Sequence, residues 1–348
     1  MQNKVKKLNL IFIKTLILLI SVLFTPFEAK TNNLNQKLKW ERVDSKVFQE
    51  DVDKLLDFKD SKKLLNYSLT KFNPRVRAAG RNITINDVLY PEISNYVPNG
   101  FVEDPNKSFT ITSKFISKTR SYGCEGDLLN CADGILNINY NFVNLDKLSF
   151  GLNYTIQSLT SRRGGTEIGE GGSMGFKLAK EISENWSIAL GGENIIHFDD
   201  HTDLGRNFYL VSSNFFPIND SDNSPLLFLT FGVGSDFFGY KGNGNLGTIN
   251  CLGNNTLTVP DSNDCQLGLI SSASILFNEH LGLVAEWFGY SFGAGISTKP
   301  IKNYPLTFSI YATDFLGDFP KYINDGKNSK CSNDICETRF YGNISISF

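Results

Sequence analysis

Residues 338–348 read TRFYGNISISF, and this stretch decides how the rest of the chain is interpreted. Side chains of an extended strand alternate between two faces. One face therefore gathers the apolar side chains of the stretch, and the other gathers its polar side chains together with Tyr341. The apolar face holds Phe340, Ile344, Ile346 and Phe348. This alternation predicts a strand with one side in an apolar environment and the other in a polar one.

The stretch resembles the closing strand of Gram-negative outer-membrane β-barrels, which end on an aromatic residue preceded by alternate apolar residues. The resemblance implies that Phe340, Ile344, Ile346 and Phe348 form the assembly signal that the barrel-assembly machinery recognises. A second stretch, LVAEWFGYSFGAGIS followed by PLTFSIYATDF, is similar to barrel segments of cyanobacterial outer-membrane proteins. Together these resemblances imply a porin-like protein located in the outer membrane, in contact with outer-membrane lipid and lipopolysaccharide.

The first 29 residues have the pattern of a secretory signal peptide. Lys4, Lys6 and Lys7 precede an apolar run over 8–24, which Lys14 interrupts. The longest unbroken apolar stretch is about 10 residues, short of the roughly 20 that span a bilayer as a helix. We expect cleavage near Ala29. This removes four lysines and one glutamate, a net +3, so the formal charge falls from −2 to −5. That mild acidity argues against nucleic acid as a partner.

Residues 30–107 read as a separate region. Apolar residues at near-helical spacing in VFQEDVDKLLDF predict a short amphipathic helix within 47–58. The chain that follows contains turn residues and short apolar runs but no long alternation. We interpret this region as a small α/β segment, which is either periplasmic or folded into the barrel as a plug.

Residues 108–348 predict an all-β fold, an antiparallel transmembrane β-barrel of about 12 strands. Alternating runs of roughly ten residues separated by turn residues are typical of such barrels. The expected strands cover 109–120, 135–143, 148–159, 173–182, 186–197, 207–217, 226–238, 266–277, 281–288, 291–298, 306–315 and 338–348. The alternative is an extracellular β-sandwich. Apolar faces that carry no charge, and connections that alternate between long and short, favour the barrel.

Six cysteines form three local pairs, and all three lie in the long, external connections. They are Cys124 with Cys131, Cys251 with Cys265, and Cys331 with Cys336. Six cysteines allow 15 connectivities, and proximity in an exported chain favours disulfides within each pair. The spacings and the lack of nearby histidines do not match a zinc site.

Charged residues on the polar strand faces are expected to line the lumen. The alternation places there Lys114, Lys118, Arg120, Lys177, Glu193, Asp236, Glu286, Lys299 and Arg339. Charges inside a barrel are costly unless they are hydrated or paired. Two outcomes therefore remain open, a wet pore with a slight excess of positive charge or a salt-bridged lumen that is closed. Small residues on the same faces favour the pore.

Other motifs give no catalytic or cofactor site. The run GNGNLG at 242–247 lacks the strand and helix that a dinucleotide site needs. The acidic loop FDDHTD at 198–203 is a solvated loop or a weak cation site. None of the three histidines is followed two residues later by serine, as in barrel phospholipases. We therefore expect neither an enzyme nor a bound cofactor or metal.

The sequence predicts a narrow, passive channel for small hydrophilic solutes. The alternative is a surface barrel that does not transport and whose disulfide-clipped external loops bind a partner. Ion selectivity would separate these two hypotheses, since only the first requires charges on the wall of an open lumen.

Overall fold

The computed structural model describes residues 74–117, 132–159, 168–199, 206–219, 224–238, 246, 248–250, 264–289, 291–314 and 338–348. The predicted signal peptide, the helix expected within 47–58, and the residues Lys118 and Arg120 lie outside this set. So do five of the six cysteines and the side chain of the sixth, Cys265. The disulfide prediction is therefore untested. Among the described residues, no helix is long and apolar enough to cross a membrane.

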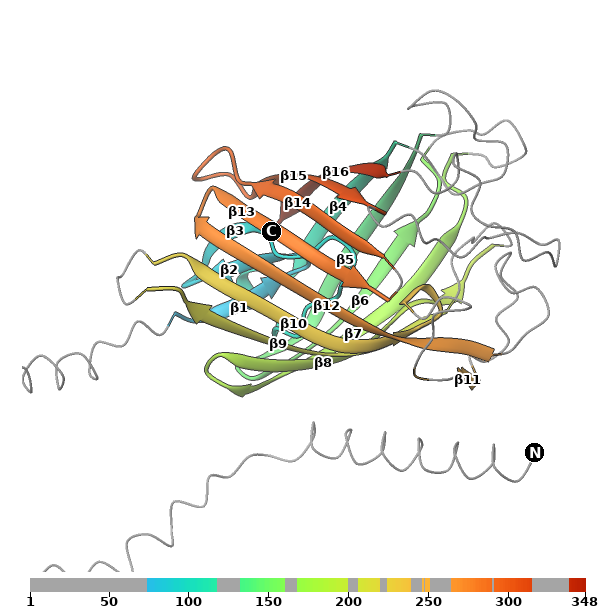
Figure 1. Ribbon diagram of the computed structural model, residues 1–348, viewed down its shortest axis with the longest axis horizontal. Helices are drawn as coiled ribbons and strands as arrows, with labels where there is room; N and C mark the ends of the chain where they lie inside the picture. Colours follow the sequence, from blue (N-terminus) through green and yellow to red (C-terminus); the bar gives the residue numbers. More distant parts are fainter. Residues whose placement is uncertain are drawn as a thin grey trace, which may run out of the picture. The chain divides into compact units, whose positions relative to one another are not determined.

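Twelve strands form one closed antiparallel sheet, in which consecutive barrel strands pair and the last pairs with the first (Figure 1). They are β4 Phe109–Ile116, β5 Asp133–Leu145, β6 Leu148–Ile156, β7 Gly172–Ser183, β8 Trp186–His197, β9 Asn207–Pro217, β10 Leu226–Ser235, β12 Asp264–Asn278, β13 Leu281–Phe288, β14 Phe292–Thr298, β15 Leu306–Thr313 and β16 Arg339–Ser347. The short β11 (Thr248–Asn250) adds to the end of β12. The predicted fold class is confirmed.

The barrel closes between its first and last strands. Thr112 of β4 pairs with Ser345 of β16, and Phe109 and Phe348 exchange backbone hydrogen bonds at 3.2 and 2.8 Å. One end of the barrel, which we call the short-turn end, carries the brief connections β5–β6, β7–β8 and β12–β13. The other end, which we call the long-loop end, carries the connections β4–β5, β6–β7, β8–β9, β10–β12 and β15–β16, together with the short β13–β14 connection.

Several expected strands are too long: 109–120 ends as a strand at Ile116, 148–159 at Ile156 and 306–315 at Thr313. The run 226–238 ends as a strand at Ser235, and Asp236–Phe238 form a turn of 3-10 helix, η3. This turn takes Phe237, which alternation would direct toward lipid, away from the lipid-facing side. The Phe237 ring instead stacks on that of Phe288 and lies tilted against that of Tyr96, with ring centroids 6.1 and 5.2 Å apart. The alternation could not predict this, because an aromatic residue suits either surroundings.

The outer face of the barrel is apolar. Large hydrophobic side chains that point away from the lumen are among the most exposed in the molecule, and they include Phe115, Tyr140, Phe142, Phe231, Leu269, Leu283, Ile296, Ile310, Phe340 and Phe348. A soluble protein does not expose apolar surface on this scale, whereas a closed antiparallel barrel with an apolar exterior is the architecture of outer-membrane proteins. The predicted location in the outer membrane is thereby confirmed.

Residues 74–107, which we call the luminal segment, pack against the inner face of the barrel wall. The segment contains β1 Val76–Ala79, β2 Asn82–Ile85 and β3 Val88–Glu92, which form a small antiparallel sheet, and then η2, Pro105–Lys107. Figure 1 shows this sheet inside the ring of barrel strands. Ile83, Val97, Phe101 and Val102 are 0–2 % exposed. Apolar burial therefore contributes to holding the segment in place.

Candidate functional site

The described charged residues predicted to line the lumen contact the luminal segment or another wall residue. Lys114, Lys177, Glu193 and Glu286 bind the luminal segment, Lys299 binds both the segment and Glu279, and Arg339 pairs with Asp314 of the wall. Asp236 lies in η3, and its side chain is outside the described set. These contacts divide the lumen into two sides that differ in packing.

The first side, formed by β13–β16, is packed against the luminal segment through buried carboxylates. Glu286 is 1 % exposed and accepts hydrogen bonds from three successive backbone amides, those of Asn95, Tyr96 and Val97, at 3.0–3.2 Å. Successive N–H groups that converge in this way form an anion-binding concavity. The carboxylate of the wall thus fixes the bend of the segment.

At Glu92 the carboxylate belongs to the luminal segment, and side chains of the wall donate hydrogen bonds to it. Ser345 Oγ lies 2.9 Å away, Asn343 Nδ2 3.0 Å and Tyr311 Oη 3.2 Å. Glu92 itself is fully buried. Its backbone amide donates to Ser297 Oγ at 2.9 Å. Strands β14, β15 and β16 are therefore tied to one residue of the segment.

Cations that the sequence placed in the lumen are compensated. Lys177 Nζ lies 2.7 Å from Glu103 Oε1, and Arg339 forms an ion pair with Asp314. Lys299, in the turn after β14, donates to Leu89 O at 2.8 Å. Burial lowers the pKa of Lys299, and nearby Glu279 opposes that shift. The wall therefore offers less free positive charge than a count of its lysines and arginines indicates.

The second side, formed by β5–β8, faces the tip of the first hairpin of the luminal segment. Gly80 and Arg81 make the two-residue turn between β1 and β2, and Gly80 has φ +66°. A glycine with positive φ at the first central position is typical of a type II′ hairpin turn. The turn presents Arg81 to the wall, where its Nη2 lies 3.2 Å from Glu193 Oε1.

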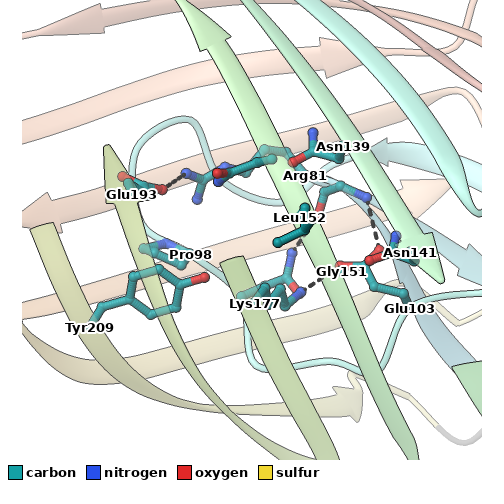
Figure 2. A pocket seen from close by; sticks show the side chains of 13 residues that line it. Arg81, Pro98, Glu103, Asn139, Asn141, Gly151, Leu152, Lys177, Glu193 and Tyr209 are labelled. Atoms are coloured by element: carbon teal, nitrogen blue, oxygen red, sulfur yellow. Dashed lines mark hydrogen bonds and ion pairs between the residues drawn. The ribbon is translucent and has the colours of Figure 1, made fainter. Parts of the chain in front are cut away.

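Two cavities border the Arg81–Glu193 ion pair, one on either side of it, and the second extends from this side to Lys114 of β4 and Tyr341 of β16. The first has a volume of about 60 Å³ and the second about 90 Å³, and Arg81, Asn153 and Glu193 line both. Figure 2 shows the first, with Arg81 reaching Glu193 above Lys177 and Tyr209. The first cavity touches Asn99, Asn139 and Asn141, and the second touches Asn137, Asn194 and Asn207.

The register of β5 and β6 shows that the cavities follow one another along the barrel wall. Asn137 pairs with Thr155 beside the second cavity, Asn139 with Asn153, and Asn141 with Gly151 beside the first. Successive rungs on one face are about 7 Å apart along a strand. The Asn141 rung is nearer the short-turn end. The two cavities thus lie in series between the two ends of the barrel.

A bulge in β8 turns two consecutive side chains toward this side. Met174 pairs with Ile196 and Phe176 with Gly192, so that residues 193–195 stand opposite the single residue Gly175. Asn194 has φ +54°, and both Glu193 and Asn194 line the second cavity. Simple alternation would direct Asn194 outward, so the sequence analysis missed it. An asparagine two residues after a glycine pair in a strand is the signal that could have indicated a bulge.

The small wall residues do not leave the open space that the sequence analysis expected from them. A Cβ at Gly191 would collide with the Tyr209 ring, one at Gly151 with Asn141 Oδ1, and one at Gly295 with Tyr311. These glycines make room for neighbouring wall side chains. The space in the lumen instead lies between the wall and the luminal segment.

Arg81, which lines both cavities, was also missed by the sequence analysis. It precedes the alternating runs, so no barrel periodicity places it. The short apolar runs on either side of Gly80–Arg81 could have indicated a hairpin tip. The structure places Asn137, Asn139, Asn141 and Asn153 of β5 and β6 in the lumen, opposite the apolar outer faces of these strands.

Comparison with known proteins gives structural neighbours of low similarity. No family model and no curated protein matches the chain. An outer membrane channel from Pseudomonas putida F1 is 10 % identical, covers 73 % of this chain and all of its own, and has a TM-score of 0.37. Outer membrane protein Omp33 of Acinetobacter baumannii is 9 % identical over 70 % of this chain and 98 % of its own, with a TM-score of 0.32. OprD of Pseudomonas aeruginosa is 10 % identical over 70 % of this chain and 95 % of its own, with a TM-score of 0.27.

Proposed function

We propose that this protein is a narrow, passive outer-membrane channel for small hydrophilic solutes, whose route runs between the luminal segment and the wall of β5–β8. The observation that carries the proposal is the series of two polar cavities on either side of the Arg81–Glu193 ion pair. Residues of three successive rungs of β5 and β6 line this route. The packed side, by contrast, is filled by the buried contacts of Glu286 and Glu92 with their partners.

The narrowest point of the proposed route is the ion pair itself. The side chains of Arg81 and Glu193 are 20 % and 26 % exposed, so solvent screens their attraction. Fully exposed pairs stabilise a protein by about 0–1 kcal/mol, and for this partly buried pair we expect a value of about 1 kcal/mol. Thermal motion can therefore separate the two side chains and join the cavities. Glu193 keeps a second contact when this happens, since Asn207 Nδ2 lies 3.3 Å from its Oε2.

Charge compensation limits the ion selectivity of such a channel. Lys114, Lys177 and Arg81 bring three positive charges to the cavity walls, and Glu103 and Glu193 bring two negative ones. Lys114 Nζ is held by Asn95 O at 2.6 Å. We expect a weak preference for anions rather than the strong one that uncompensated lysines would give. The proposal includes no catalytic residue.

The test is single-channel conductance in planar lipid bilayers, with protein purified from the outer membranes of an expression host. We expect small, steady steps from the wild type and larger steps from Arg81→Ala, because the narrowest point is removed. The control is Arg75→Ala, which breaks another exposed ion pair of the luminal segment, with Asp146 at 3.2 Å, outside both cavities. Its conductance should match that of the wild type.

The proposal would be overturned if none of the three proteins showed conductance steps although each gave the band of a folded barrel in gel electrophoresis without heating. The surface barrel that does not transport would then be the better account. Equal steps from all three would place the route elsewhere in the lumen. The exposed Phe340, Ile344 and Phe348 on the outer face of β16 support their proposed role in the assembly signal under either account.

A further inference from the structure

Polar atoms without partners point to what the two cavities bind. Within the described part of the chain, Arg81 Nη1, Asn153 Oδ1 and Asn207 Oδ1 are buried and have no hydrogen-bond partner in the protein. All three residues line the second cavity, and Arg81 and Asn153 also line the first. A buried polar atom left unsatisfied costs about 1–3 kcal/mol. These three residues thus carry one donor and two acceptors without partners, and a change of side-chain rotamer would turn these atoms toward a bound molecule.

The charges around these atoms do not favour a charged ligand. Glu193 is shared between Arg81 and Asn207, and Glu103 is paired with Lys177. An anion would have to displace Asn95 O and Oδ1 from Lys114, and any other charged solute would have to break one of these pairs or remain uncompensated. Burying an unpaired charge is expensive. A hydroxyl group both donates and accepts a hydrogen bond. It therefore fits the mixture of one free donor and two free acceptors without disturbing the pairs.

The remaining lining matches a hydroxylated molecule as well. Asparagine amides also donate and accept, and they dominate the polar surface of both cavities. Tyr209 borders the first cavity, and Tyr96, Phe237 and Tyr341 border the second. Aromatic faces beside polar groups provide contact for the C–H faces of a polyol, which a wall of amides alone would not.

The volumes set the size of the ligand. The cavities of about 60 and 90 Å³ add to about 150 Å³ when the ion pair opens. An engineered cavity of about 150 Å³ accommodates a benzene ring. The joined site therefore accepts a molecule of roughly that size, and each cavity alone accepts a smaller one.

We propose that the two cavities around Arg81 and Glu193 form a binding site for a small, neutral, polyhydroxylated solute, through which such a solute passes in preference to charged solutes. This inference rests on the proposed channel function and specifies its substrate class. The binding site makes uptake saturable, whereas a mere sieve would pass solute in linear proportion to its concentration.

The experiment measures uptake of labelled erythritol and labelled tartrate, two four-carbon hydroxylated molecules that differ in charge, into liposomes containing the full protein. We expect erythritol to enter at least tenfold faster than tartrate and its uptake to saturate. The double variant Asn153→Leu, Asn207→Leu should lower erythritol uptake at least fivefold, whereas Asn214→Leu should leave both erythritol uptake and KCl conductance unchanged. Asn214→Leu is the matched control, because Asn214 follows the inward-facing Ser213 on β9 and points away from the lumen.

The possible failures are distinguishable. The binding site would be overturned if tartrate entered as fast as erythritol, or if erythritol uptake rose linearly with concentration. The channel proposal would still hold in that case if the wild type conducted KCl. An unchanged double variant would also overturn the site. Absence of both conductance and uptake in the wild type would overturn the channel and the site together. A gel band of the folded barrel for each variant separates loss of the site from loss of folding.

Discussion

The two sides of the lumen differ in the burial and the hydrogen bonds of a carboxylate on the barrel wall. On the packed side Glu286 is 1 % exposed and accepts from three backbone amides of the luminal segment. On the side of β5–β8 the Glu193 side chain is 26 % exposed and shares one ion pair and one weaker hydrogen bond. The first carboxylate holds structure in place, and the second leaves space around it. Burial and the number of donors distinguish the two roles, whereas residue type does not.

The difference follows from the side chains that each part of the wall turns inward. Strands β14–β16 present short hydroxyl groups, which let the segment's backbone approach closely, and these include Ser297, Thr307, Ser309, Ser345 and Ser347. Strands β5 and β6 present longer amides instead, Asn137, Asn139, Asn141 and Asn153. Longer side chains keep the segment at a distance, and polar cavities fill the intervening space.

The largest expected effect on stability comes from removing the Glu286 carboxylate, which holds the packed side together. Glu286→Ala would leave three buried amides without an acceptor, and each costs about 1–3 kcal/mol. We expect the free energy of unfolding to fall by about 4 kcal/mol, measured by urea titration in lipid vesicles. Hydrogen exchange at residues 95–97 should accelerate at least a hundredfold. Unchanged exchange there would show that Glu286 does not hold the bend.

A smaller effect is expected at the bulge that shapes the cavity side. Asn194→Val would force a β-branched residue to adopt φ +54° and would remove the acceptor of Ser173 Oγ, 2.7 Å away. We expect a loss of about 2 kcal/mol in the same titration. Asn194→Gly also removes the hydrogen bond, but glycine adopts a positive φ without strain. The free energy of unfolding should therefore fall about half as much as in Asn194→Val. Equal losses in the two variants would exclude backbone strain as the cause.

The smallest effect is expected at Glu193, and it sharpens the comparison directly. Glu193→Ala removes a carboxylate from the lumen just as Glu286→Ala does, but from a partly exposed ion pair. We expect the free energy of unfolding to change by about 1 kcal/mol. A loss as large as that of Glu286→Ala would show that the second side is also packed, and would contradict a route along it.

Alternation predicted the barrel because lipid and lumen impose opposite demands on successive residues. The expected strands at 186–197 and 207–217 coincide with β8 and β9, and the exposed Phe340 and Ile344 lie on the predicted face of β16. Alternation could not predict the site. Arg81 belongs to a segment whose folding depends on the wall, and Asn194 enters the lumen only because a bulge breaks the period.

The luminal segment enters the barrel twice, first as the hairpin of β1 and β2 and then from β3 onward, and both times it returns to the short-turn end. Arg75 contacts Asp146 at the short-turn end. The first hairpin turns back at Gly80–Arg81, and η2 later returns the chain to the start of β4. No part of the segment is threaded through the opposite opening. A mechanical pull on the chain before residue 75 would therefore load the ion pairs of Arg75 and Arg77 first, then peel β1 from β2. The segment could leave the cylinder from its N-terminal side without opening the seam between β4 and β16.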